Sequence, residues 1–294
     1  MAQRQTATIE EQADRIVRQL GGKWYGASAM CRCPAHADGR ASLSIRVGER
    51  AVLFHCFAGC TTDAIMAALR SGRILAPADH DPGQRQEGKA DLNKLALAVW
   101  RHAEPFAGTL ADRYLRVGRS IVPGGINVRF DPRCQCGAGA AKAYAPALIV
   151  PIEEDAGVVA IHRTFLAPDG RWKADMDEPK RMLGNPGVGA VRWGGIPVDG
   201  ILRLAEGVED AASVMNLLGA GHSVWPVLGI ERYQAIAIPE SIHTVVIYSQ
   251  HGMEAARAIE RATPHLTANG RQLVVKLPPH AGDWNDLLRE IRSL

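Results

Sequence analysis

The sequence predicts an α/β fold, α+β overall, with a zinc-ribbon-like finger first, a mixed α/β middle domain next and a domain built on a Rossmann-like parallel sheet last. Two close Cys/His pairs near the N-terminus predict the finger. Apolar strands that alternate with amphipathic helices after Gly200 predict the parallel sheet. The length of 294 residues requires more than one ordinary domain. We expect domains at 1–75, 93–195 and 196–294, with a linker at 76–92.

Composition places the chain among ordinary folded proteins. Hydrophobic residues make up 47% and charged residues 22%, which excludes a mainly disordered chain. No apolar run approaches the roughly 18–20 residues that span a bilayer, and residues 1–11 are polar. We therefore expect a cytoplasmic protein without a membrane partner. The first two thirds are basic on balance and the last third is acidic, which fits a polyanion-binding part joined to a part that holds divalent cations.

The N-terminal part reads as short elements around a Cys-rich stretch. Apolar residues at helical spacing predict a helix over 9–20, which Gly21 and Gly22 end. Strands follow at 43–47 and 51–54, and a helix at 62–70 is capped by Thr61 or Thr62. Proline and glycine with few apolar residues mark 76–91 as a linker.

In the rest of the chain, proline and glycine interrupt the middle part, and strands and helices alternate regularly in the C-terminal part. The sequence has no internal repeat. In the middle we expect a helix over 92–103 and strands over 147–152 and 158–165. The regular end alternates strands at 201–205, 223–227, 244–248 and 272–276 with helices at 208–218, 253–262 and 284–291.

Four residues in the N-terminal part have the spacing of zinc ligands. Two tight turns would supply a tetrahedral set of soft or borderline ligands without an open position, so the site would be structural. The predicted ligands are Cys33, His36, Cys56 and Cys60. Cys31 and His55 lie beside them and stay open as substitute ligands. Cys134 and Cys136 lack a second pair, so they read as incidental thiols in a loop.

These motifs resemble the CHC2 zinc-binding domain of bacterial, phage and plasmid DNA primases, where Cys-Pro-x-His precedes an aromatic-rich hairpin that ends in a second cysteine pair. The Cys-x-x-x-Cys spacing of Cys56 and Cys60 is similar to the phage and plasmid branch. Residues 161–165, 168–170 and 179–184 resemble the middle region of primase-like proteins from mobile elements. The resemblance implies a role in mobile-element DNA replication.

The last third resembles Toprim, the nucleotidyl-transfer and strand-cleavage fold of primases and topoisomerases. Its first signature is a glutamate followed by glycine at the end of a strand, here Glu206 and Gly207. A carboxylate at the carboxyl end of a parallel strand points into the crevice where such sheets bind ligands. The alternative for Glu206 is a cap of the following helix.

The second Toprim signature, an Asp-x-Asp that holds magnesium, is missing. The strand at 245–248 is present, but Gln250 and Gly252 take the aspartate positions. Mg²⁺ or Mn²⁺ would be held weakly, because these ions prefer carboxylate oxygens. His251 is a metal ligand, a base or simply a solvated side chain. The remaining acidic candidates for catalysis are Glu206, Asp283 and Asp286.

Cations interleaved with aromatic rings predict a single-strand-binding surface in the middle domain. The first candidates are Lys180, Arg181, Arg163 and Lys173. Further candidates are Arg113, Arg116, Arg119, Arg129 and Arg192, with Trp172 and Trp193 as stacking rings. A smaller surface beside the zinc ligands contains Arg32, Arg40 and Arg46 with Trp24 and Tyr25.

The first functional hypothesis is a DNA primase-like protein. It would bind a single-stranded DNA template and nucleotides, and synthesise RNA primers by metal-dependent nucleotidyl transfer. The alternative is a catalytically inactive DNA-binding module that recruits replication partners such as a replicative helicase. A third possibility is a Toprim nuclease, which would need the same missing metal ligands. The chain has no Walker A motif, so we expect no helicase motor within it.

Overall fold

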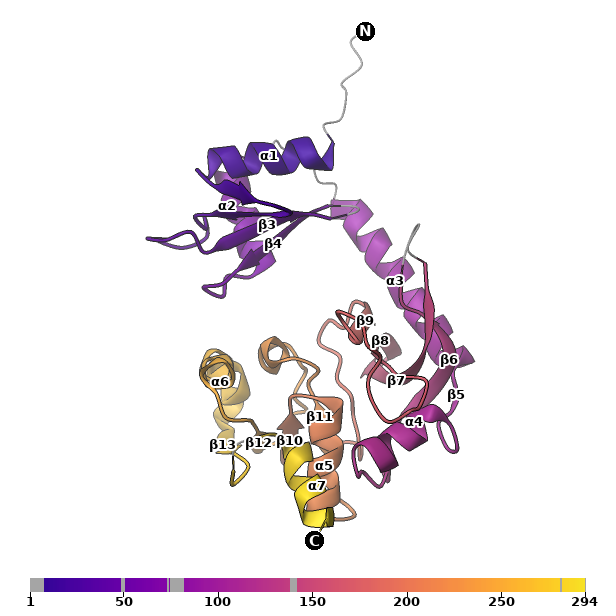
Figure 1. Cartoon of the computed structure of the whole chain (residues 1–294). Coiled ribbons are helices and arrows are strands. Elements are labelled where there is room, and N and C mark those ends of the chain that lie inside the picture. The colour runs from indigo at the N-terminus through magenta and orange to yellow at the C-terminus, as the bar shows by residue number, and fades with distance from the viewer. Residues whose placement is uncertain are drawn as a thin grey trace. The chain divides into compact units, whose positions relative to one another are not determined.

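The computed structural model describes residues 8–48, 51–72, 74, 82–137, 142–280 and 282–293. The chain divides into two compact units, Met1–Arg85 and Gln86–Leu294 (Figure 1). Each unit is described by itself below.

The first unit is an antiparallel sheet with two helices that share one core with it. Thr8 and Glu11 form a reciprocal capping box at the start of the first helix, which fixes where that helix begins. Ile16, Ile45 and Leu69 come from different elements and meet in one buried core. The elements are α1 (Ile9–Gln19), β1 (Lys23–Tyr25), β2 (Ser28–Cys31), β3 (Leu43–Val47), β4 (Val52–Cys56) and α2 (Thr62–Ser71), with strand order β1-β2-β3-β4.

A long helix, α3 (Pro82–His102), begins at the end of the first unit and continues into the second, which corrects the expected linker. Residues 82–91 are helical despite their proline and glycine content. The proline stands at the first helical position, where its missing N–H is not needed. Residues 75–81 of the expected linker lie outside the described residues. The helix therefore starts about ten residues earlier than the composition predicts.

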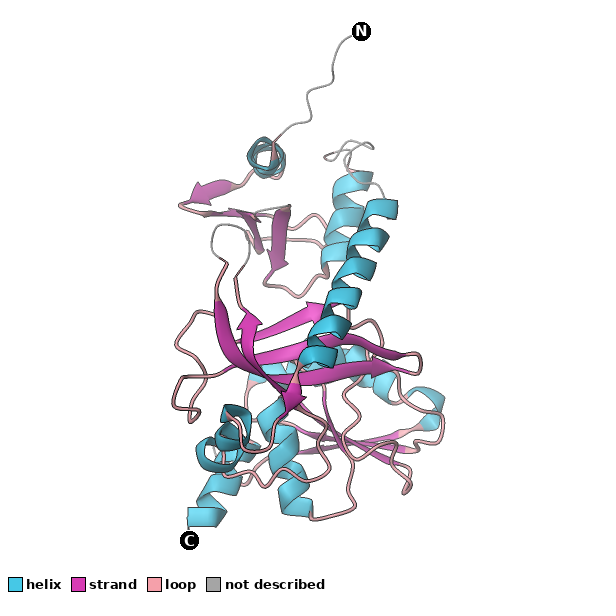
Figure 2. Cartoon of the chain, turned by 90° about the vertical axis from the view of Figure 1, so that its right-hand side faces the viewer, coloured by secondary structure: helices cyan, strands magenta, loops and turns pink. Residues whose placement is uncertain are grey.

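The middle region forms one antiparallel sheet with order β5-β6-β7-β8-β9, crossed by α3 (Figure 2). Its strands are β5 (Glu104–Pro105), β6 (Arg129–Gln135), β7 (Tyr144–Glu154), β8 (Gly157–Phe165) and β9 (Lys180–Gly184). Ala96 and Trp100 of α3 pack against Ile149 and Phe165 on one face. The two predicted strands are the centre of this sheet, and β5, β6 and β9 were not predicted.

The C-terminal region is a parallel sheet with helices on both faces, as predicted. Strand order is β11-β10-β12-β13, and α5 and α7 lie on one face with α6 on the other (Figure 1). The elements are β10 (Ile201–Ala205), α5 (Val208–Leu218), β11 (Val224–Pro226), β12 (Thr244–Tyr248), α6 (Met253–Leu266), β13 (Gln272–Lys276) and α7 (Trp284–Ser293). Side chains alternate between the two faces, so Val246 meets α5 and α7 while Val245 meets α6.

The middle and C-terminal regions share one hydrophobic core. Leu148 and Val150 of β7 belong to the same buried cluster as Val208 and Ala211 of α5. A π-type turn, Tyr114–Gly118, follows the short helix α4 (Leu110–Arg113) and adds its own buried side chains to this cluster. The segments expected as separate domains at 93–195 and 196–294 therefore lie within one compact unit.

None of the helices that the structure describes combines the length and the apolar character needed to cross a membrane.

Candidate functional site

The predicted zinc ligands meet in the first unit. The ligand atoms of Cys33, His36, Cys56 and Cys60 all lie within 4.8 Å of one another. Gly59, at φ 91°, lets the chain turn back after β4, and its N–H bonds to the Cys56 carbonyl. Sulfur and nitrogen atoms bound to zinc at about 2.0–2.3 Å are separated by distances of this size. The cluster therefore fits a closed structural zinc ion.

Asp38 lies beside the histidine of this cluster. Nε2 of His36 lies 3.7 Å from Asp38 Oδ1, while Nδ1 lies 3.1 Å from Cys60 Sγ. Nδ1 is thus the nitrogen that would face the metal. Asp38 also accepts hydrogen bonds from the Cys33 N–H at 2.7 Å and from the Ser42 hydroxyl at 2.7 Å, and these bonds lower its pKa to about 2. Asp38 therefore joins the turn at Cys33 to the start of the hairpin at Ser42.

The two substitute ligands are not in the cluster. Cys31 is buried in the apolar core of the first unit, and burial raises the pKa of its thiol to about 11. His55 is exposed and packs edge-on against the Phe57 ring. Cys134 and Cys136 likewise fall outside any metal-holding group among the described residues.

Glu206 stands at the carboxyl end of β10, where the sequence predicts it. Its Oε2 accepts a hydrogen bond of 2.9 Å from Nε2 of Gln250, which follows β12. The two strands are parallel neighbours, so their ends bring the side chains together. Burial raises the pKa of Glu206, and the nearby Glu231 adds to this effect while Lys180 opposes it. The amide of Gln250 thus occupies the side of Glu206 where the fold would place an aspartate.

The described residues at this edge do not fit a magnesium site. Over all the described residues, the Cys/His cluster of the first unit is the one group of three or more possible metal ligands, so the acidic side chains at this edge do not form such a group. Gln250 directs an N–H donor at Glu206, and Gly252, at φ 137°, offers no side chain. Mg²⁺ requires several oxygen ligands in octahedral geometry. His251 donates its Nε2–H to the Pro278 carbonyl at 2.9 Å, so this nitrogen cannot bind a metal in that state.

Asp283 and Asp286 cap the start of α7. The Asp286 N–H donates to Asp283 Oδ1 at 2.8 Å, and the Asp283 N–H donates to Asp286 Oδ2 at 3.3 Å. The Trp284 N–H reaches Asp210 Oδ1 at 3.1 Å, which ties this helix start to α5. The structure therefore brings Asp283 beside Asp210, an acid that the sequence analysis did not select.

Asp210 carries the clearest perturbation among these acids. Burial, reinforced by the charges of Asp283 and Glu209, raises its pKa to about 7, although Lys180 opposes the shift. One sequence signal could have identified Asp210. It is an acid four residues after the signature glutamate, in the first turn of the following helix.

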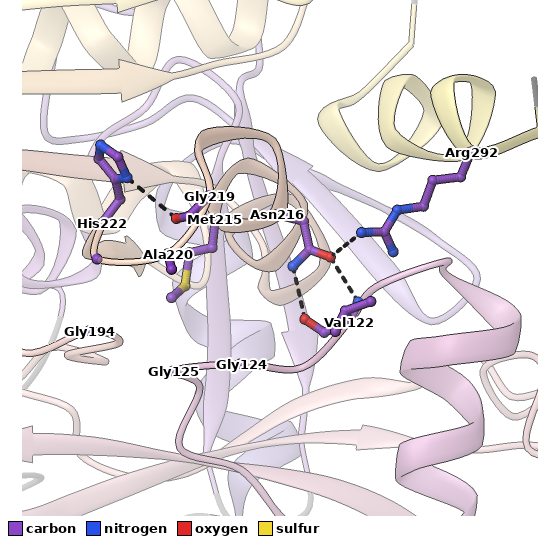
Figure 3. Close-up of a pocket in the computed structure, with 11 residues that line it drawn as sticks. Val122, Gly124, Gly125, Gly194, Met215, Asn216, Gly219, Ala220, His222 and Arg292 are labelled. Atoms are coloured by element: carbon purple, nitrogen blue, oxygen red, sulfur yellow. Dashed lines mark hydrogen bonds between the residues drawn. The ribbon is translucent and has the colours of Figure 1, made fainter.

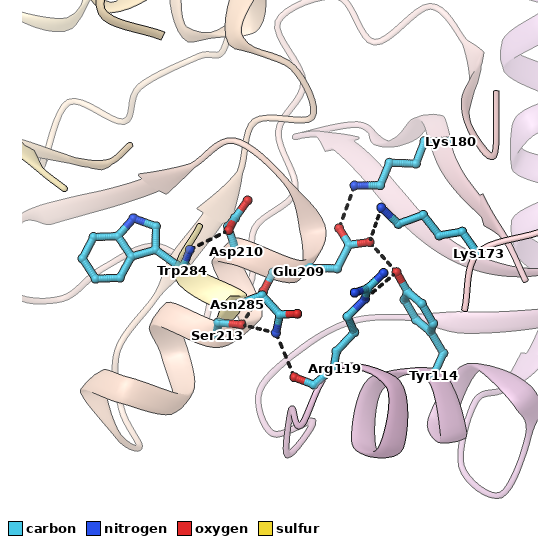
Figure 4. Close-up of polar contacts among 9 residues, drawn as sticks. All are labelled: Tyr114, Arg119, Lys173, Lys180, Glu209, Asp210, Ser213, Trp284 and Asn285. Atoms are coloured by element: carbon cyan, nitrogen blue, oxygen red, sulfur yellow. Dashed lines mark hydrogen bonds and ion pairs between the residues drawn. The ribbon is translucent and has the colours of Figure 1, made fainter. Parts of the chain in front are cut away.

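A buried carboxylate, Glu209, joins the two halves of the second unit (Figure 4). Its Oε2 lies 2.9 Å from Lys180 Nζ, and its Oε1 lies 3.8 Å from Lys173 Nζ and accepts the Tyr114 hydroxyl at 2.6 Å. Arg119 donates to the same hydroxyl at 3.0 Å. Burial alone would raise the pKa of Glu209, but the two ammonium groups and the tyrosine hold it well below its usual range. Sequence reasoning missed this residue, because only the fold brings its partners near.

The four cations chosen first from the sequence line a single pocket of about 610 Å³. Arg163 and Arg181 face each other across the β8–β9 pair. Their guanidinium groups donate to main-chain carbonyls, Arg163 to Gln135 and Met182 and Arg181 to Glu178 and Cys136. The pocket, called the cationic pocket below, is lined by Arg163, Lys173, Glu178, Pro179, Lys180, Arg181 and Met182.

Some of the other candidate contacts have structural roles. Trp193 is 1% exposed and donates its indole N–H to the Asn127 carbonyl, so it cannot stack on a base. Arg129 packs over Trp100 and bonds to its carbonyl, and Arg192 pairs with Asp155. Trp172 is 52% exposed and remains available as a stacking ring.

The zinc-bearing sheet presents an open face with rings and cations. Tyr25, Arg46 and Leu53 belong to one cross-strand row, through Ser28 on β2. All three are exposed, while the alternate side chains of β3 and β4 enter the core. The predicted surface beside the zinc ligands therefore contains an accessible ring and a cation.

Histidine substitutions should separate the zinc ligand from its neighbour. His36→Ala should reduce bound zinc well below one equivalent, because it removes one of four ligands and zinc binding is coupled to folding of this unit. His55→Ala is the matched control and should keep one equivalent. Zinc content measured by atomic absorption on the undenatured proteins checks this. Full zinc in His36→Ala would contradict the ligand assignment.

Asp210 should make the stability of the second unit depend on pH. Its folded pKa of about 7 lies above its ordinary value of 3.8, so the fold favours the neutral acid. Its contribution to the unfolding free energy is therefore lost as pH rises from about 4 to about 7. Asp210→Asn, which keeps the acceptor for Trp284, should gain stability relative to the unaltered protein as pH rises.

Urea unfolding of both proteins at about pH 5 and pH 8 measures this difference. A stability difference that does not change with pH would contradict the raised pKa.

Two models of known domain families match the chain. Residues 201–292 match the Toprim domain, and residues 90–193 match DUF7146, a domain of unknown function. Among curated proteins, none matches the sequence.

Several solved primase structures are similar to the chain. The zinc-binding and RNA polymerase domains of the Aquifex aeolicus primase are 15% identical, with 98% of this chain and 85% of that chain covered and a TM-score of 0.48. A DNA primase domain from Pseudomonas aeruginosa is 15% identical, with 68% and 74% covered and a TM-score of 0.48. The primase fragment of the bacteriophage T7 primase-helicase protein is 11% identical, with 88% and 93% covered and a TM-score of 0.43.

The chain thus ends in a Toprim domain at residues 201–292, and its N-terminal Cys/His cluster fits a CHC2-like zinc finger, the combination that its motifs predict for DNA primase-like proteins.

Proposed function

We propose that the protein is a DNA primase-like protein that holds a single-stranded DNA template, or the nucleotides paired with it, in the cationic pocket. The observation that carries the proposal is the place of that pocket. Lys180 lines it and also contacts Glu209, three residues after Glu206 in the Toprim motif. A phosphate bound there would lie next to the acidic edge of the Toprim sheet.

The charge balance of the cationic pocket favours an anion. Glu209 pairs with both lysines, so it offsets part of their charge. Arg163 and Arg181 have no carboxylate partner in the described chain, because their hydrogen bonds go mostly to neutral main-chain carbonyls. Nε of Arg163 is buried without a hydrogen-bond partner among the described residues. A buried donor without a partner is costly, and a phosphate oxygen or a water molecule would satisfy it.

The open face of the zinc-bearing sheet would add sequence-tolerant contacts. Tyr25 offers a ring for base stacking, and Arg46 offers a cation for the backbone. Trp172, near Arg119 in the second unit, is a further stacking candidate. A surface that binds single strands of many sequences needs both aromatic rings and cations.

For the finer activity, the first candidate is primer synthesis by metal-dependent nucleotidyl transfer, with Glu206, Asp283 and Asp286 as its acidic residues. The second candidate is a catalytically silent module that binds DNA and recruits a replication partner. We propose that this partner is a replicative helicase of a phage or plasmid system. The hydrogen bond from Gln250 to Glu206 favours this second candidate. It satisfies the glutamate without the carboxylates that Mg²⁺ needs.

Neutralising the two arginines should weaken single-strand binding. Arg163→Gln with Arg181→Gln should reduce the slope of log affinity against log salt by up to about 1.4, at roughly 0.7 for each phosphate contact. Arg116→Gln is the control, because this exposed arginine is paired with Asp112 outside the pocket. Fluorescence anisotropy with labelled oligo(dT) at several salt concentrations gives the slope. An unchanged slope in the double variant would overturn the proposed template site.

Restoring one carboxylate should improve metal binding at the Toprim edge. Gln250→Asp should raise Mn²⁺ affinity about tenfold, the effect of roughly 1.4 kcal/mol, by adding an anionic oxygen ligand next to Glu206. Gln250→Asn shortens the side chain equally without charge and should leave the affinity unchanged. Gly252 is left unaltered, because any side chain at φ 137° is strained.

Primer synthesis on single-stranded template is measured on the same variants. Activity should rise in Gln250→Asp and disappear when Glu206→Ala is added. Robust synthesis by the unaltered protein that survives Glu206→Ala would place the active site elsewhere.

A further inference from the structure

A second cavity lies away from the acidic edge of the Toprim sheet. Three loops that each contain glycine converge on it, at residues 122–125, at Gly194 and at residues 219–222, and they surround a volume of about 530 Å³ (Figure 3). Ligand pockets for small molecules commonly have volumes of about 300–1,000 Å³. The sequence analysis assigned no role to these glycines.

The topology places this cavity at the opposite end of the sheet from Glu206. Glu206 and Gly207 precede α5, whereas Gly219 and His222 follow it and lead into β11. Since α5 has 11 residues, its two ends are about 16 Å apart. The cavity is therefore separate from the acidic edge and shares no lining residue with the cationic pocket.

Side-chain and main-chain hydrogen bonds hold the cavity open. The Asn216 amide accepts the Val122 N–H at 2.8 Å and donates to the Val122 carbonyl at 3.0 Å (Figure 3). The Gly194 N–H bonds to the Gly125 carbonyl at 3.2 Å, which joins the other two loops. The loops that form the walls are thus fixed before any ligand arrives, and preformed walls lower the cost of binding.

The walls suit a flat ligand. A Cβ atom added at Gly124, Gly219 or Gly221 would meet no atom within 4 Å, so each of these glycines borders open space. Gly219 and Gly221 have positive φ, but Gly124 does not, so its backbone conformation would accept a side chain. Met215 contributes a thioether, a group that contacts aromatic rings favourably. Peptide planes and a thioether are surfaces on which a heterocycle can stack.

The polar groups point to a nucleobase and an anion. His222 donates its Nδ1–H to the Gly219 carbonyl at 3.3 Å, which leaves Nε2 of the neutral ring as an acceptor for an amino group. Arg292 is the one charged residue of the lining, and its hydrogen bonds go to the neutral oxygens of Ser120 and Asn216. His222 and Arg292 stand on opposite sides of Met215 and Asn216 (Figure 3).

We propose that this cavity binds a purine nucleotide. The base lies along the glycine walls and Met215, its exocyclic amino group donates to His222, and its phosphate contacts Arg292. Free mononucleotide and the terminal nucleotide of a strand share this chemistry. The site goes beyond template binding in the cationic pocket and does not depend on it.

Binding of AMP to the full-length protein, measured by equilibrium dialysis without divalent metal, tests the site. Gly124→Leu fills the cavity and should weaken AMP binding at least about tenfold, whereas the matched Gly124→Ala should have a small effect. Arg292→Gln, which keeps a donor for Asn216, should weaken AMP but not adenosine, because only AMP carries the phosphate. Circular dichroism shows whether each variant is folded.

The arginine double variant of the cationic pocket separates this site from the proposed template site, and it should bind AMP as the unaltered protein does. If a 5′-phosphorylated oligo(dA) competes with AMP, the natural ligand is the end of a strand. If the oligonucleotide does not compete, the natural ligand is a free nucleotide. No binding of AMP, equal binding by Gly124→Leu, or loss of binding in the double arginine variant would each overturn the proposal.

Discussion

The buried carboxylate of Glu209 is the interaction on which the arrangement of the second unit depends. A carboxylate that is 7% exposed cannot stay charged without partners, since its desolvation costs several kcal/mol. Lys180 and Lys173 come from the middle region, and Tyr114 comes from the π-type turn. Satisfying this one charge therefore fixes the middle sheet, the turn and the Toprim helix α5 relative to one another. If one of these partners were removed, the carboxylate would still be desolvated but would have less compensation for the cost.

This constraint also sets the chemistry available at the Toprim edge. The same lysine that pairs with Glu209 opposes the rise in pKa of both Glu206 and Asp210, so an ammonium group supplies positive charge beside these acids. Gln250 then satisfies Glu206 with a neutral donor. An edge arranged in this way can stay folded without a divalent ion, while Arg163 and Arg181 keep positive charge in the cationic pocket.

Local patterns in the sequence predict the features that depend on neighbouring residues. The zinc ligands, the β3–β4 hairpin and the alternating elements after Gly200 all follow from spacing and periodicity. Trp193 was wrongly expected on the surface, because burial of an indole depends on distant segments that pack over it. Glu209 could not be selected, since its partners lie 29 to 95 residues away in the chain. The glycine-walled cavity depends in the same way on three loops that only the fold brings together.

The central claim is that phosphate is held between Arg163 and Arg181 while Glu206 stays hydrogen-bonded to Gln250 without a metal ion. A crystal structure of the protein with a short oligo(dT) in the presence of Mn²⁺, with anomalous scattering to locate the ion, tests both halves at once. The account predicts a backbone phosphate in contact with both guanidinium groups and no manganese at Glu206. Manganese bound to Glu206 with Gln250 displaced, or DNA that avoids the cationic pocket, would contradict it.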